Sequence, residues 1–378
     1  MANNLNKIVL ASGIVPPEIG GPATYVNKLG QRLVEAGYRV KVISYGDTKS
    51  EIDDVLSVQR ITRKTNVINR YWQYFQQLRK LAKWADIIYA QDLISVGLPC
   101  ALVKVFSPKT KIAVRLGGDF LWEKAYNNGW TKYPLSQYHA QPKNFKEKIY
   151  LAIYRFTLAK FDQIIFSTKW QRDIYERHFP VVKNKSVVID NAFPETLRAS
   201  VGQQTDNCSI LYAGRLIKLK NVASIIEAIK DLKHIRLNII GNGPEKEHLV
   251  TLVNKLGMSD RVHFKKRMTL ENLGKEIARS HFTIIPSISD VSPNMALESI
   301  RLNTPVLLTK ESGFYTDFKD KLIFIDPLDI SDIQSKILSM FDEDKYKEYL
   351  ATVTAMDSGR GWHELAKEHI DLFKKILS

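Results

Sequence analysis

Short apolar runs rich in β-branched residues alternate along the whole chain with longer stretches in which apolar residues recur every three to four positions. The short runs predict strands and the longer stretches predict helices. Most of the runs are continuously apolar, which is typical of parallel strands covered on both faces. We expect strands at residues 6–15, 39–46, 85–92, 111–118, 162–168, 185–191, 208–215, 235–243, 261–266, 282–289, 304–310 and 321–326.

These strands fall into two groups, one on either side of a polar segment at residues 191–209. Because alternating strands and helices build a parallel sheet between two helical layers, we expect an α/β protein with two doubly wound, Rossmann-like domains. The first domain is expected over residues 1–192 and the second over residues 193–360. A last helix is expected over residues 361–378.

The positive charge of the chain is concentrated in its first half. The formal net charge is +15; residues 1–190 hold 29 lysines and arginines against 15 acidic residues, whereas residues 191–378 hold 26 against 25. This asymmetry favours an anionic partner, which is a nucleic acid, a membrane surface or a phosphorylated substrate. No helix-turn-helix, zinc or RNA-binding signature accompanies the charge, so we expect no nucleic-acid partner.

The composition, 44% hydrophobic and 25% charged over 378 residues, is that of an ordinary globular protein. The two cysteines, Cys100 and Cys208, are far apart in sequence. This argues against a disulfide framework or a cysteine metal site and favours a reducing, cytoplasmic location. No apolar run is long enough to span a bilayer.

The loops after the strands hold the candidate residues, because ligands of such sheets bind beyond the carboxyl ends of the strands. After the first strand, Gly20 and Gly21 precede a helix. They let the backbone approach a phosphate or sugar, or they form only a tight turn, and both interpretations stay open. Further on, Arg215 and Lys220 lie close to a helix start, where cations are unfavourable unless an anion is bound. An arginine fork and a lysine point charge suit a diphosphate.

A second glycine pair, Gly241 and Gly243, follows the strand at 235–243 and precedes a helix. This turn matches half of a dinucleotide fingerprint, but Lys246 occupies the position of the third glycine. The match by itself is therefore a weak indication of nucleotide binding.

The stretch DVSPNMALES, residues 290–299, combines several features of a ligand site. Ser292 is expected to cap a helix whose first residue is Pro293. The amides of Asn294 and Met295 would then point out of the helix start, where they can bind an anion.

Two carboxylates frame the same stretch. Glu298 lies beyond the first turn and suits the neighbouring hydroxyls of a ribose, because a carboxylate accepts two hydrogen bonds at once. Asp290 lies in the loop at the strand end, where it can meet the hydroxyls of a sugar.

The motifs GRLIKLK, GNGP and DVSPNMALES…NTPVL, in this order and spacing, resemble the second domain of the family 4 glycosyltransferases of the GT-B fold. The Gly-Gly loop, GLPCALVKV and VVIDN fit the first domain, so the resemblance spans nearly the whole chain. The family typically has two glutamates separated by seven residues, and here the first is shortened to Asp290. The resemblance implies two domains that face each other across a cleft, with the helix 361–378 crossing back to the first.

The resemblance implies a retaining transfer of a hexose from a nucleotide sugar, GDP-mannose or a UDP-hexose, with no metal and no other cofactor. The acidic run at 342–344 is accordingly interpreted as solvated surface. The implied catalytic residues are Asp119, Arg215, Lys220 and Asp290. The implied donor-binding residues are Gly20, Gly21, Arg215, Lys220, Gly241, Gly243, Arg267, Asp290, Pro293, Asn294, Met295 and Glu298.

The loop after the fourth strand departs from the family pattern. Many relatives carry a histidine there, whereas this chain reads VRLGGDFLWEK. Asp119 is the candidate for the group that faces the sugar, with Arg115 orienting it. The missing histidine leaves a catalytically inactive binding module as one alternative, and a nucleotide-sugar epimerase is another.

In relatives the first domain binds the acceptor, often a lipid-linked or phosphorylated glycan, which agrees with the basic first half and implies cell-envelope polysaccharide or glycolipid synthesis. Residues 66–84 mix cations with aromatic residues and are interpreted either as a helix lying on an anionic bilayer or as an ordinary sheet-covering helix. Residues 130–156 are interpreted as a mobile acceptor loop. We therefore expect a cytoplasmic protein at the inner face of the cell membrane.

Overall fold

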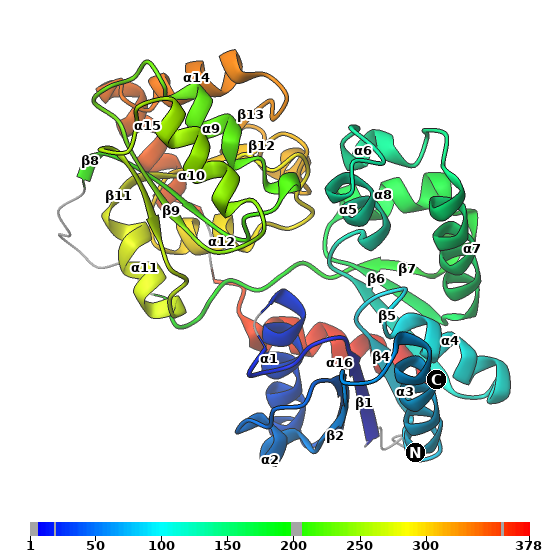
Figure 1. The fold of residues 1–378 in the computed structure, drawn as a ribbon. Helices are drawn as coiled ribbons and strands as arrows, with labels where there is room; N and C mark the ends of the chain where they lie inside the picture. Colours follow the sequence, from blue (N-terminus) through cyan, green and yellow to red (C-terminus); the bar gives the residue numbers. More distant parts are fainter. Residues whose placement is uncertain (1–6, 19, 198–205, 357–358) are drawn as a thin grey trace. The chain divides into compact units, whose positions relative to one another are not determined.

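A computed structural model describes residues 7–18, 20–197, 206–356 and 359–378. The chain divides into two compact units, each with its own parallel sheet (Figure 1). Unit 1 comprises Met1–Leu121, Ala140–Ala192 and Trp362–Ser378. Unit 2 comprises Trp122–His139 and Phe193–Gly361. Part of the polar segment that was expected to link the domains, residues 198–205, lies outside the described residues.

The strands of unit 1 are β1 (Lys7–Ser12), β2 (Arg39–Tyr45), β3 (Val58–Ile61), β4 (Ile87–Ala90), β5 (Lys111–Leu116), β6 (Gln163–Phe166) and β7 (Ser186–Val188). They form one parallel sheet in the order β3-β2-β1-β4-β5-β6-β7. Six of them lie where the apolar runs predict strands. The pattern did not predict β3, because this short edge strand reads VQRI and lacks the continuous apolar run of a strand covered on both faces.

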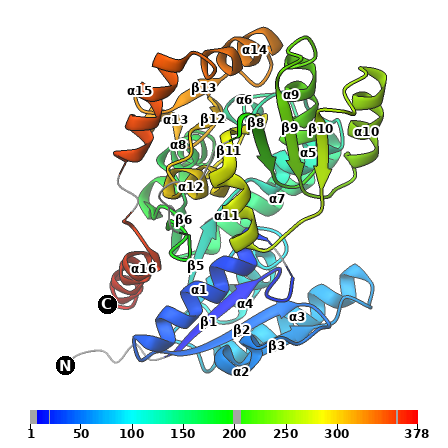
Figure 2. The ribbon, with the colours of Figure 1, turned by 90° about the vertical axis from the view of Figure 1, so that its left-hand side faces the viewer.

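Helices cover the sheet of unit 1 on both faces (Figure 2). The helices are α1 (Gly21–Glu35), α2 (Ile52–Leu56), α3 (Val67–Ala82), α4 (Gly97–Phe106), α7 (Phe145–Lys160), α8 (Lys169–His178), α16 (Trp362–Leu377) and the 3-10 helix η1 (Pro180–Lys185). Helix α16 packs against α1, and α4 packs against both α3 and α7. Leu365 and Phe373 of α16 join the core formed by α1 and the sheet, so the last helix belongs to unit 1.

Residues 145–156, which the sequence placed in a mobile loop, form most of helix α7. A capping box starts this helix: the Asn144 side chain accepts from the amide of Glu147 at 3.0 Å, and the Glu147 carboxylate accepts from the amide of Asn144 at 2.9 Å. The basic and aromatic composition of the stretch obscured this start signal.

The strands of unit 2 are β8 (Asp206–Ala213), β9 (Arg236–Ile240), β10 (Val262–Lys265), β11 (Ser280–Ile285), β12 (Val306–Thr309) and β13 (Ile323–Ile325). They form a parallel sheet in the order β10-β9-β8-β11-β12-β13. The helices are α6 (Leu135–Tyr138), α9 (Val222–Ala228), α10 (Lys246–Lys255), α11 (Leu270–Arg279), α12 (Asn294–Arg301), α13 (Tyr315–Phe318), α14 (Ile330–Ser339), α15 (Glu343–Thr354) and the 3-10 helix η2 (Lys218–Lys220). Helix α5 (Phe120–Asn127) spans the boundary between the units.

Each sheet has a topological switch point, where the strand order reverses. It lies between β1 and β4 in unit 1 and between β8 and β11 in unit 2. Ligands of doubly wound sheets bind beyond the carboxyl ends of the strands at this point. The loops that begin at Gly214 and Pro286 are therefore the first place to look in unit 2, and those at Gly13 and Gln91 in unit 1.

The interior of unit 2 contains a buried arginine. Arg261 is 8% exposed, and its guanidinium donates to the carbonyl oxygens of Lys230 (2.6 Å), Ile229 (3.0 Å), Leu232 (3.1 Å) and Ile235 (3.4 Å). It thereby satisfies the carbonyl groups left at the end of α9 and in the turn that leads to β9. Four carbonyl oxygens surround the charge, so it is well solvated by the backbone.

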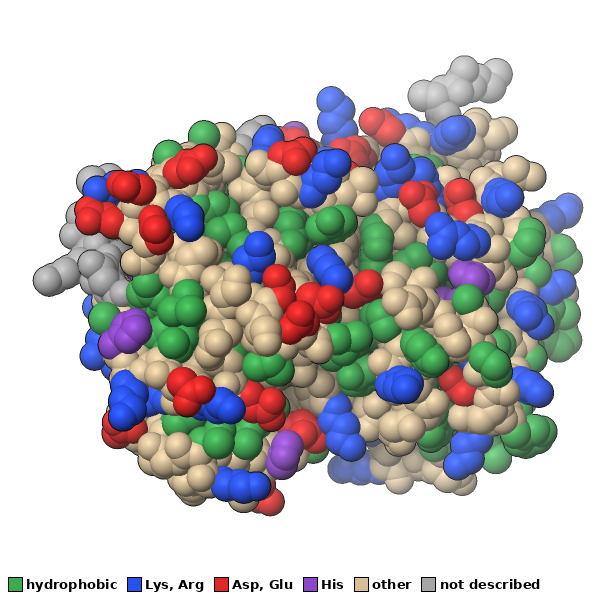
Figure 3. All heavy atoms as spheres, turned by 90° about the horizontal axis from the view of Figure 1, so that it is seen from above, with side chains coloured by type: hydrophobic (Ala, Val, Ile, Leu, Met, Phe, Trp, Pro, Cys, Tyr) green, Lys and Arg blue, Asp and Glu red, His purple; other side chains and the backbone are tan. Residues whose placement is uncertain are grey.

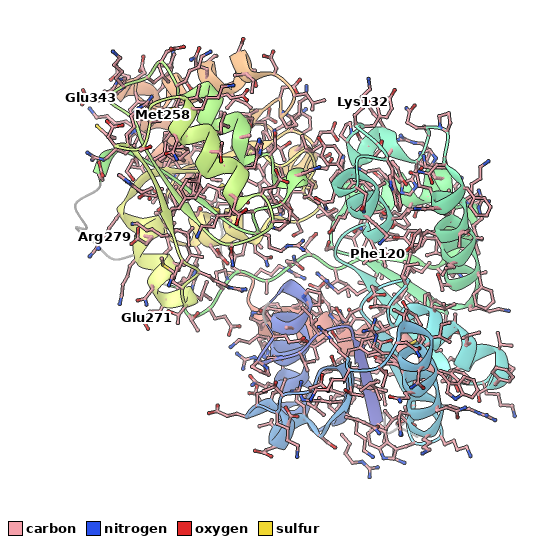
Figure 4. The ribbon with its side chains drawn as sticks, in the orientation of Figure 1. Phe120, Lys132, Met258, Glu271, Arg279 and Glu343 are labelled. Carbon is pink, nitrogen blue, oxygen red and sulfur yellow. The ribbon has the colours of Figure 1, made fainter. Side chains whose placement is uncertain are left out.

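We expect Arg261→Met to destabilise the protein, because it leaves these carbonyl oxygens buried without donors. An unsatisfied buried group costs about 1–3 kcal/mol, and we expect a total loss of roughly 3 kcal/mol. Thermal denaturation should show a melting temperature lower by several degrees. Arg279→Met is the control, since Arg279 is exposed at the end of α11 (Figure 4). Equal melting temperatures for the two variants would contradict the structural role of Arg261.

Candidate active site

The two glycines of the loop after β9 are required by the packing of the loop after β8. A Cβ atom on Gly241, whose φ is +155°, would lie 1.9 Å from the carbonyl oxygen of Gly214. A Cβ atom on Gly243 would lie 2.2 Å from the carbonyl oxygen of Leu216. The backbone contact accounts for both glycines, and their contact with a donor stays a prediction.

The central interaction of the site is an ion pair between the loops on either side of the switch point. Lys220 Nζ lies 2.5 Å from Asp290 Oδ2, and the hydroxyl of Ser287 donates to the same oxygen at 3.2 Å. The amide of Ile288 donates to the carbonyl oxygen of Leu219 at 2.9 Å. A side-chain contact and a backbone contact thus hold the two loops together.

Asn221 fixes the backbone directly after Lys220. It adopts a left-handed conformation with φ of +53°, which asparagine tolerates better than most residues. Its side-chain amide donates to the carbonyl oxygens of Pro286 (3.2 Å) and Pro327 (2.7 Å), so it joins the loops after β8, β11 and β13.

Arg215 extends from the same loop but is much less constrained than Lys220. Its side chain is 68% exposed, and Nη2 lies 3.6 Å from Oε2 of Glu123. An exposed ion pair of this length contributes about 0–1 kcal/mol at most. The guanidinium can therefore leave Glu123 for a ligand at little cost.

Residues 122–139, which interrupt unit 1 in sequence, contact the same loops of unit 2. The amide of Leu135 donates to the Ser289 hydroxyl at 2.9 Å, and Asn127 Oδ1 accepts from the amide of Leu219 at 3.4 Å. The sequence boundary at 192/193 separated these residues from the second domain, so their role was missed.

Helix α12 begins one residue later than the sequence predicts. Pro293, with φ of −70° and ψ of 108°, is the N-cap residue, and its own side chain makes no capping hydrogen bond. The assignment of the cap to Ser292 was therefore wrong, because the extended backbone of Pro293 moves the first turn to Asn294. The amides of Asn294 and Met295 lie in that first turn, where a helix offers them no carbonyl partner.

Glu298 is a carboxylate in a position that costs stability. It is half-buried on α12 and makes no side-chain hydrogen bond or ion pair with any residue in the described parts of the chain. Burial raises the pKa of Glu298 to about 7. A buried carboxyl group without a partner is typical of a functional site. A ligand with hydroxyl groups would supply the hydrogen bonds that the carboxylate of Glu298 lacks.

A second carboxyl, which the sequence pattern did not single out, belongs to the same edge of the sheet. Glu311 follows β12, and its carbonyl oxygen accepts from the amide of Asp290 at 2.9 Å. Burial raises the pKa of Glu311, while a hydrogen bond from Ser136 lowers it, and Oε2 has no partner among the described residues. Its place as the second polar residue after an apolar strand was the signal that could have identified it.

The structure brings Arg267 into no contact with these groups. It is exposed in the loop after β10, which is the edge strand next to β9. Its assignment as a donor-binding residue stays a prediction.

The candidates of unit 1 lie in different surroundings from those the sequence suggested. Asp119 is 1% exposed and accepts from the hydroxyls of Tyr154 (3.3 Å) and Tyr175 (3.0 Å), so its carboxylate is held by the interior of the unit. Arg115 does not orient it: the guanidinium donates to Asn191 Oδ1 at 2.5 Å instead. The assignment of Arg115 is thus corrected, and the catalytic role of Asp119 stays a prediction.

Gly20 and Gly21 stand at the start of α1, as expected. A Cβ atom on Gly20, the N-cap residue, would lie 2.7 Å from Cδ1 of Ile14, whereas one on Gly21 would meet nothing within 4 Å. A Cβ on the first glycine would displace the end of the Ile14 side chain, whereas the second glycine faces open space.

The described residues contain no group of three or more histidines, cysteines, aspartates or glutamates placed to hold a metal ion. The acidic run at 342–344 is exposed; Asp342 caps α15, and Glu343 lies at the outside of unit 2 (Figure 4). Among the described residues, no helix has the length and apolar character needed to cross a bilayer.

Comparison with known proteins decides the family. The model of "Glycosyl transferases group 1" matches residues 194–354, and that of "Glycosyltransferase Family 4" matches residues 19–196. The two matches together cover nearly the whole chain. The chain belongs to the family 4 glycosyltransferases. It is therefore a transferase with the GT-B fold, and the family assignment selects a transferase over an epimerase.

Individual relatives of this glycosyltransferase are distant. An uncharacterized glycosyltransferase of Methanocaldococcus jannaschii is 24% identical and aligns over 97% of this chain and 98% of its own. The lipopolysaccharide core biosynthesis glycosyltransferase LpsD of Rhizobium meliloti is 28% identical over 38% of this chain and 39% of its own. The structure of Anabaena HepE in complex with UDP-glucose is similar, with a TM-score of 0.76 and 13% identity over 98% of this chain and all of its own.

The raised pKa of Glu298 generates a prediction about stability. Its pKa of about 7 in the folded protein lies above the ordinary value of 4.5, so the folded state holds this proton more tightly than the unfolded state. Stability therefore falls as the pH rises from about 4.5 to about 7, by up to about 3 kcal/mol, and stays lower above that range. Glu298→Gln, which cannot ionise, lacks this loss.

Urea denaturation of the glycosyltransferase and Glu298→Gln at pH 5 and pH 8 measures the effect. We expect the variant to be more stable than the original protein at pH 8 and to show a much smaller advantage at pH 5. A difference that does not change with pH would show that burial of the charged form is not the cause.

Proposed function

We propose that this glycosyltransferase moves a hexose from a nucleotide sugar, GDP-mannose or a UDP-hexose, to a glycan or lipid-linked acceptor in cell-envelope synthesis. The observation that carries the proposal is the pair of Lys220 and Asp290, 2.5 Å apart at the switch point of unit 2. It supplies a cation for a diphosphate and a carboxylate for sugar hydroxyls in one place. The start of α12 follows Asp290 by four residues.

Charge that develops on the leaving diphosphate determines the chemistry. The bond from the anomeric carbon to the phosphate oxygen breaks, and its electron pair stays on the departing diphosphate. Lys220, Arg215 and the amides at the start of α12 stabilise this charge, which is the largest contribution that an enzyme makes in such reactions. Arg215 reaches the diphosphate by leaving its weak partner Glu123.

The ribose of the donor explains the unpartnered carboxyl of Glu298. Two neighbouring hydroxyls donate to an ionised carboxylate, and these hydrogen bonds favour its charged form. Hydrogen bonds from the donor then replace the solvation that Glu298 loses on burial, so donor binding offsets the unfavourable burial of its charged form.

The relatives support the choice of substrates. HepE was solved with UDP-glucose, and the Rhizobium meliloti relative acts in lipopolysaccharide core biosynthesis. A UDP-hexose donor and an acceptor glycan of the cell envelope are the corresponding substrates for this chain.

A membrane-bound acceptor fits an exposed surface on unit 1. Helix α3 buries Tyr74 and Phe75 but leaves Ile68 84% and Trp72 57% exposed, next to a shallow groove at its first turn. The buried face fits the interpretation as a sheet-covering helix, and the exposed apolar side chains support the interpretation as a bilayer-binding helix.

The charge of α3 supports an anionic bilayer as the partner of this surface. The helix contains Arg70, Arg79 and Lys80 and no acidic residue. Phe106 of α4 is 62% exposed, packs on Phe75 and lies under the Arg79 guanidinium. By contrast, the face of the molecule in Figure 3 carries acidic and basic side chains side by side. We propose that α3 and the end of α4 bind the cytoplasmic face of the membrane.

Alanine substitutions test the donor site. We expect Lys220→Ala and Arg215→Ala each to lower the rate of transfer about a hundredfold to a thousandfold, because each removes charge stabilisation from the transition state. Lys218→Ala, in the same 3-10 helix but exposed, is the control and should retain the rate. The measurement is release of nucleoside diphosphate from GDP-mannose and UDP-hexoses with a cell-envelope glycolipid extract as acceptor. Normal turnover in Lys220→Ala would refute the assignment.

Liposome flotation tests the membrane surface. We expect the protein to float with phosphatidylglycerol-containing vesicles at low salt, and the double variant Ile68→Ser, Trp72→Ser to lose most of this binding. Leu328→Ser, which changes an exposed apolar residue of unit 2, is the control. Equal flotation of the two variants, or none by the original protein, would remove the proposal.

A further inference from the structure

A polar pair that the donor site does not use lies at the switch point of unit 1 and on the strand next to it. Gln91 directly follows β4, and Arg115 is the fifth residue of β5. The register pairs Ala90 with Val114, so Gln91 and Arg115 are neighbours on adjacent parallel strands. Both are 6% exposed. The strand ends at a switch point are where a doubly wound sheet binds ligands.

The charge of Arg115 is only partly compensated. Its guanidinium donates to the neutral amide oxygen Asn191 Oδ1 at 2.5 Å and lies 3.8 Å from the centre of the Tyr25 ring. Among the described residues, no carboxylate pairs with it, and Nε has no acceptor. A buried charge without an opposite charge or a full set of hydrogen bonds lowers the stability of the folded state.

The charges of two other arginines, the buried Arg261 and the partly buried Arg60, are compensated within the fold. Arg261 donates to four backbone carbonyl oxygens. Arg60 has the carboxylate of Asp53, at 2.5 Å, and the carbonyl oxygen of Pro16, at 2.7 Å. Groups of the fold thus compensate the charges of Arg261 and Arg60, whereas the charge of Arg115 has no such compensation.

The neighbouring amide is also incompletely bonded. Neither Oε1 nor Nε2 of Gln91 has a hydrogen-bond partner among the described residues. The Tyr89 hydroxyl lies near this amide, but its hydrogen bond, 2.8 Å long, is to His369 Nε2. Buried polar groups of native proteins nearly always have hydrogen-bond partners. The unpaired donor and acceptor of the Gln91 amide therefore indicate a partner from outside the chain.

We propose that Arg115 and Gln91 bind an anionic group of the acceptor, a phosphate monoester or a carboxylate. The guanidinium supplies the forked donors that planar or tetrahedral oxyanions prefer, and the Gln91 amide supplies one further donor and an acceptor for a hydroxyl. A water molecule could satisfy the amide, but it would leave the charge of Arg115 uncompensated. The inference rests on the proposed function only in naming the ligand an acceptor.

Stability gives the first test, because a ligand-binding arginine and a structural one behave in opposite ways. We expect Arg115→Met to leave the melting temperature unchanged or to raise it, since an apolar side chain of similar length replaces an uncompensated charge. Arg261→Met is the matched contrast and should lower it. A fall for Arg115→Met as large as that for Arg261→Met would overturn the proposal.

Binding of small anions gives the second test. The full chain with Arg215→Ala and Lys220→Ala, which disable the donor site, is titrated calorimetrically with glycerol 3-phosphate, glucuronate and neutral glycerol. We expect one of the anions, but not glycerol, to bind, and Arg115→Met added to this background to weaken that binding at least about tenfold. Binding of glycerol 3-phosphate would identify the anionic group of the ligand as a phosphate, and binding of glucuronate would identify it as a carboxylate. The proposal would be overturned if the background protein binds neither anion, or if adding Arg115→Met to that background leaves the affinity for the anion unchanged.

Two further measurements separate this site from the donor site. Gln91→Leu, added to the Arg215→Ala, Lys220→Ala background, should also lower the affinity for the anion that binds. This variant keeps the proposal testable if Arg115→Met does not fold. Arg115→Met in the otherwise unchanged chain should bind UDP or GDP as the original protein does. Loss of that binding would place Arg115 in the donor site and overturn the proposal. If the original protein binds neither nucleotide, the proposed donor function fails, while the anion titrations still decide this inference.

Discussion

The ion pair of Lys220 and Asp290 is the interaction on which the account of the site depends. It joins the loops after β8 and β11, which the strand order of unit 2 places on either side of its switch point. Hydrogen bonds from the Asn221 side chain to Pro286 and from the amide of Ile288 to Leu219 also join these loops. Two opposite charges are thus fixed where the fold binds ligands, before any ligand arrives. Such preorganisation is the main way in which enzymes stabilise developing charge.

Several groups around the strand ends are left in states that folding alone does not favour. Glu298 has a raised pKa and no partner in the described residues, Glu311 has one buried oxygen without a donor, and Arg115 has no carboxylate. The charges of Arg261 and Arg60, by contrast, are compensated within the chain, by four backbone carbonyl oxygens and by the carboxylate of Asp53 respectively. Proteins depart from local satisfaction mainly at functional sites, because the ligand supplies the missing partner. The departures here occur at the carboxyl edges of both sheets.

The sequence predicted the two sheets well, because continuous apolar runs are a direct consequence of burial on both faces. It missed β3, whose residues VQRI form a short edge strand. It also found the residues around the switch point of unit 2, since the strand ends are readable from the pattern. What it could not show is pairing: that Lys220 meets Asp290, 70 residues away, or that Arg115 turns to Asn191 and not to Asp119. Such contacts depend on the register of strands and on side-chain conformation.

The role of residues 122–139 was likewise invisible in sequence. They follow the last residues of β5 and would be assigned to the first domain by position, yet Glu123, Asn127 and Leu135 contact the loops of unit 2. The order of residues along the chain determines which residues are neighbours within a helix or strand. It does not determine which unit a connecting segment packs against. The same limitation applies to Glu311, which lies beside Asp290 through a backbone hydrogen bond between two parallel loops.

A crystal structure of the protein with a bound nucleoside diphosphate would show whether Lys220, Arg215 and Glu298 form the donor site. We expect phosphate oxygens within hydrogen-bond distance of Lys220 Nζ and the Arg215 guanidinium, and ribose hydroxyls on the carboxylate of Glu298. A diphosphate bound elsewhere, with Lys220 still paired only to Asp290 and Glu298 still without a partner, would contradict this assignment.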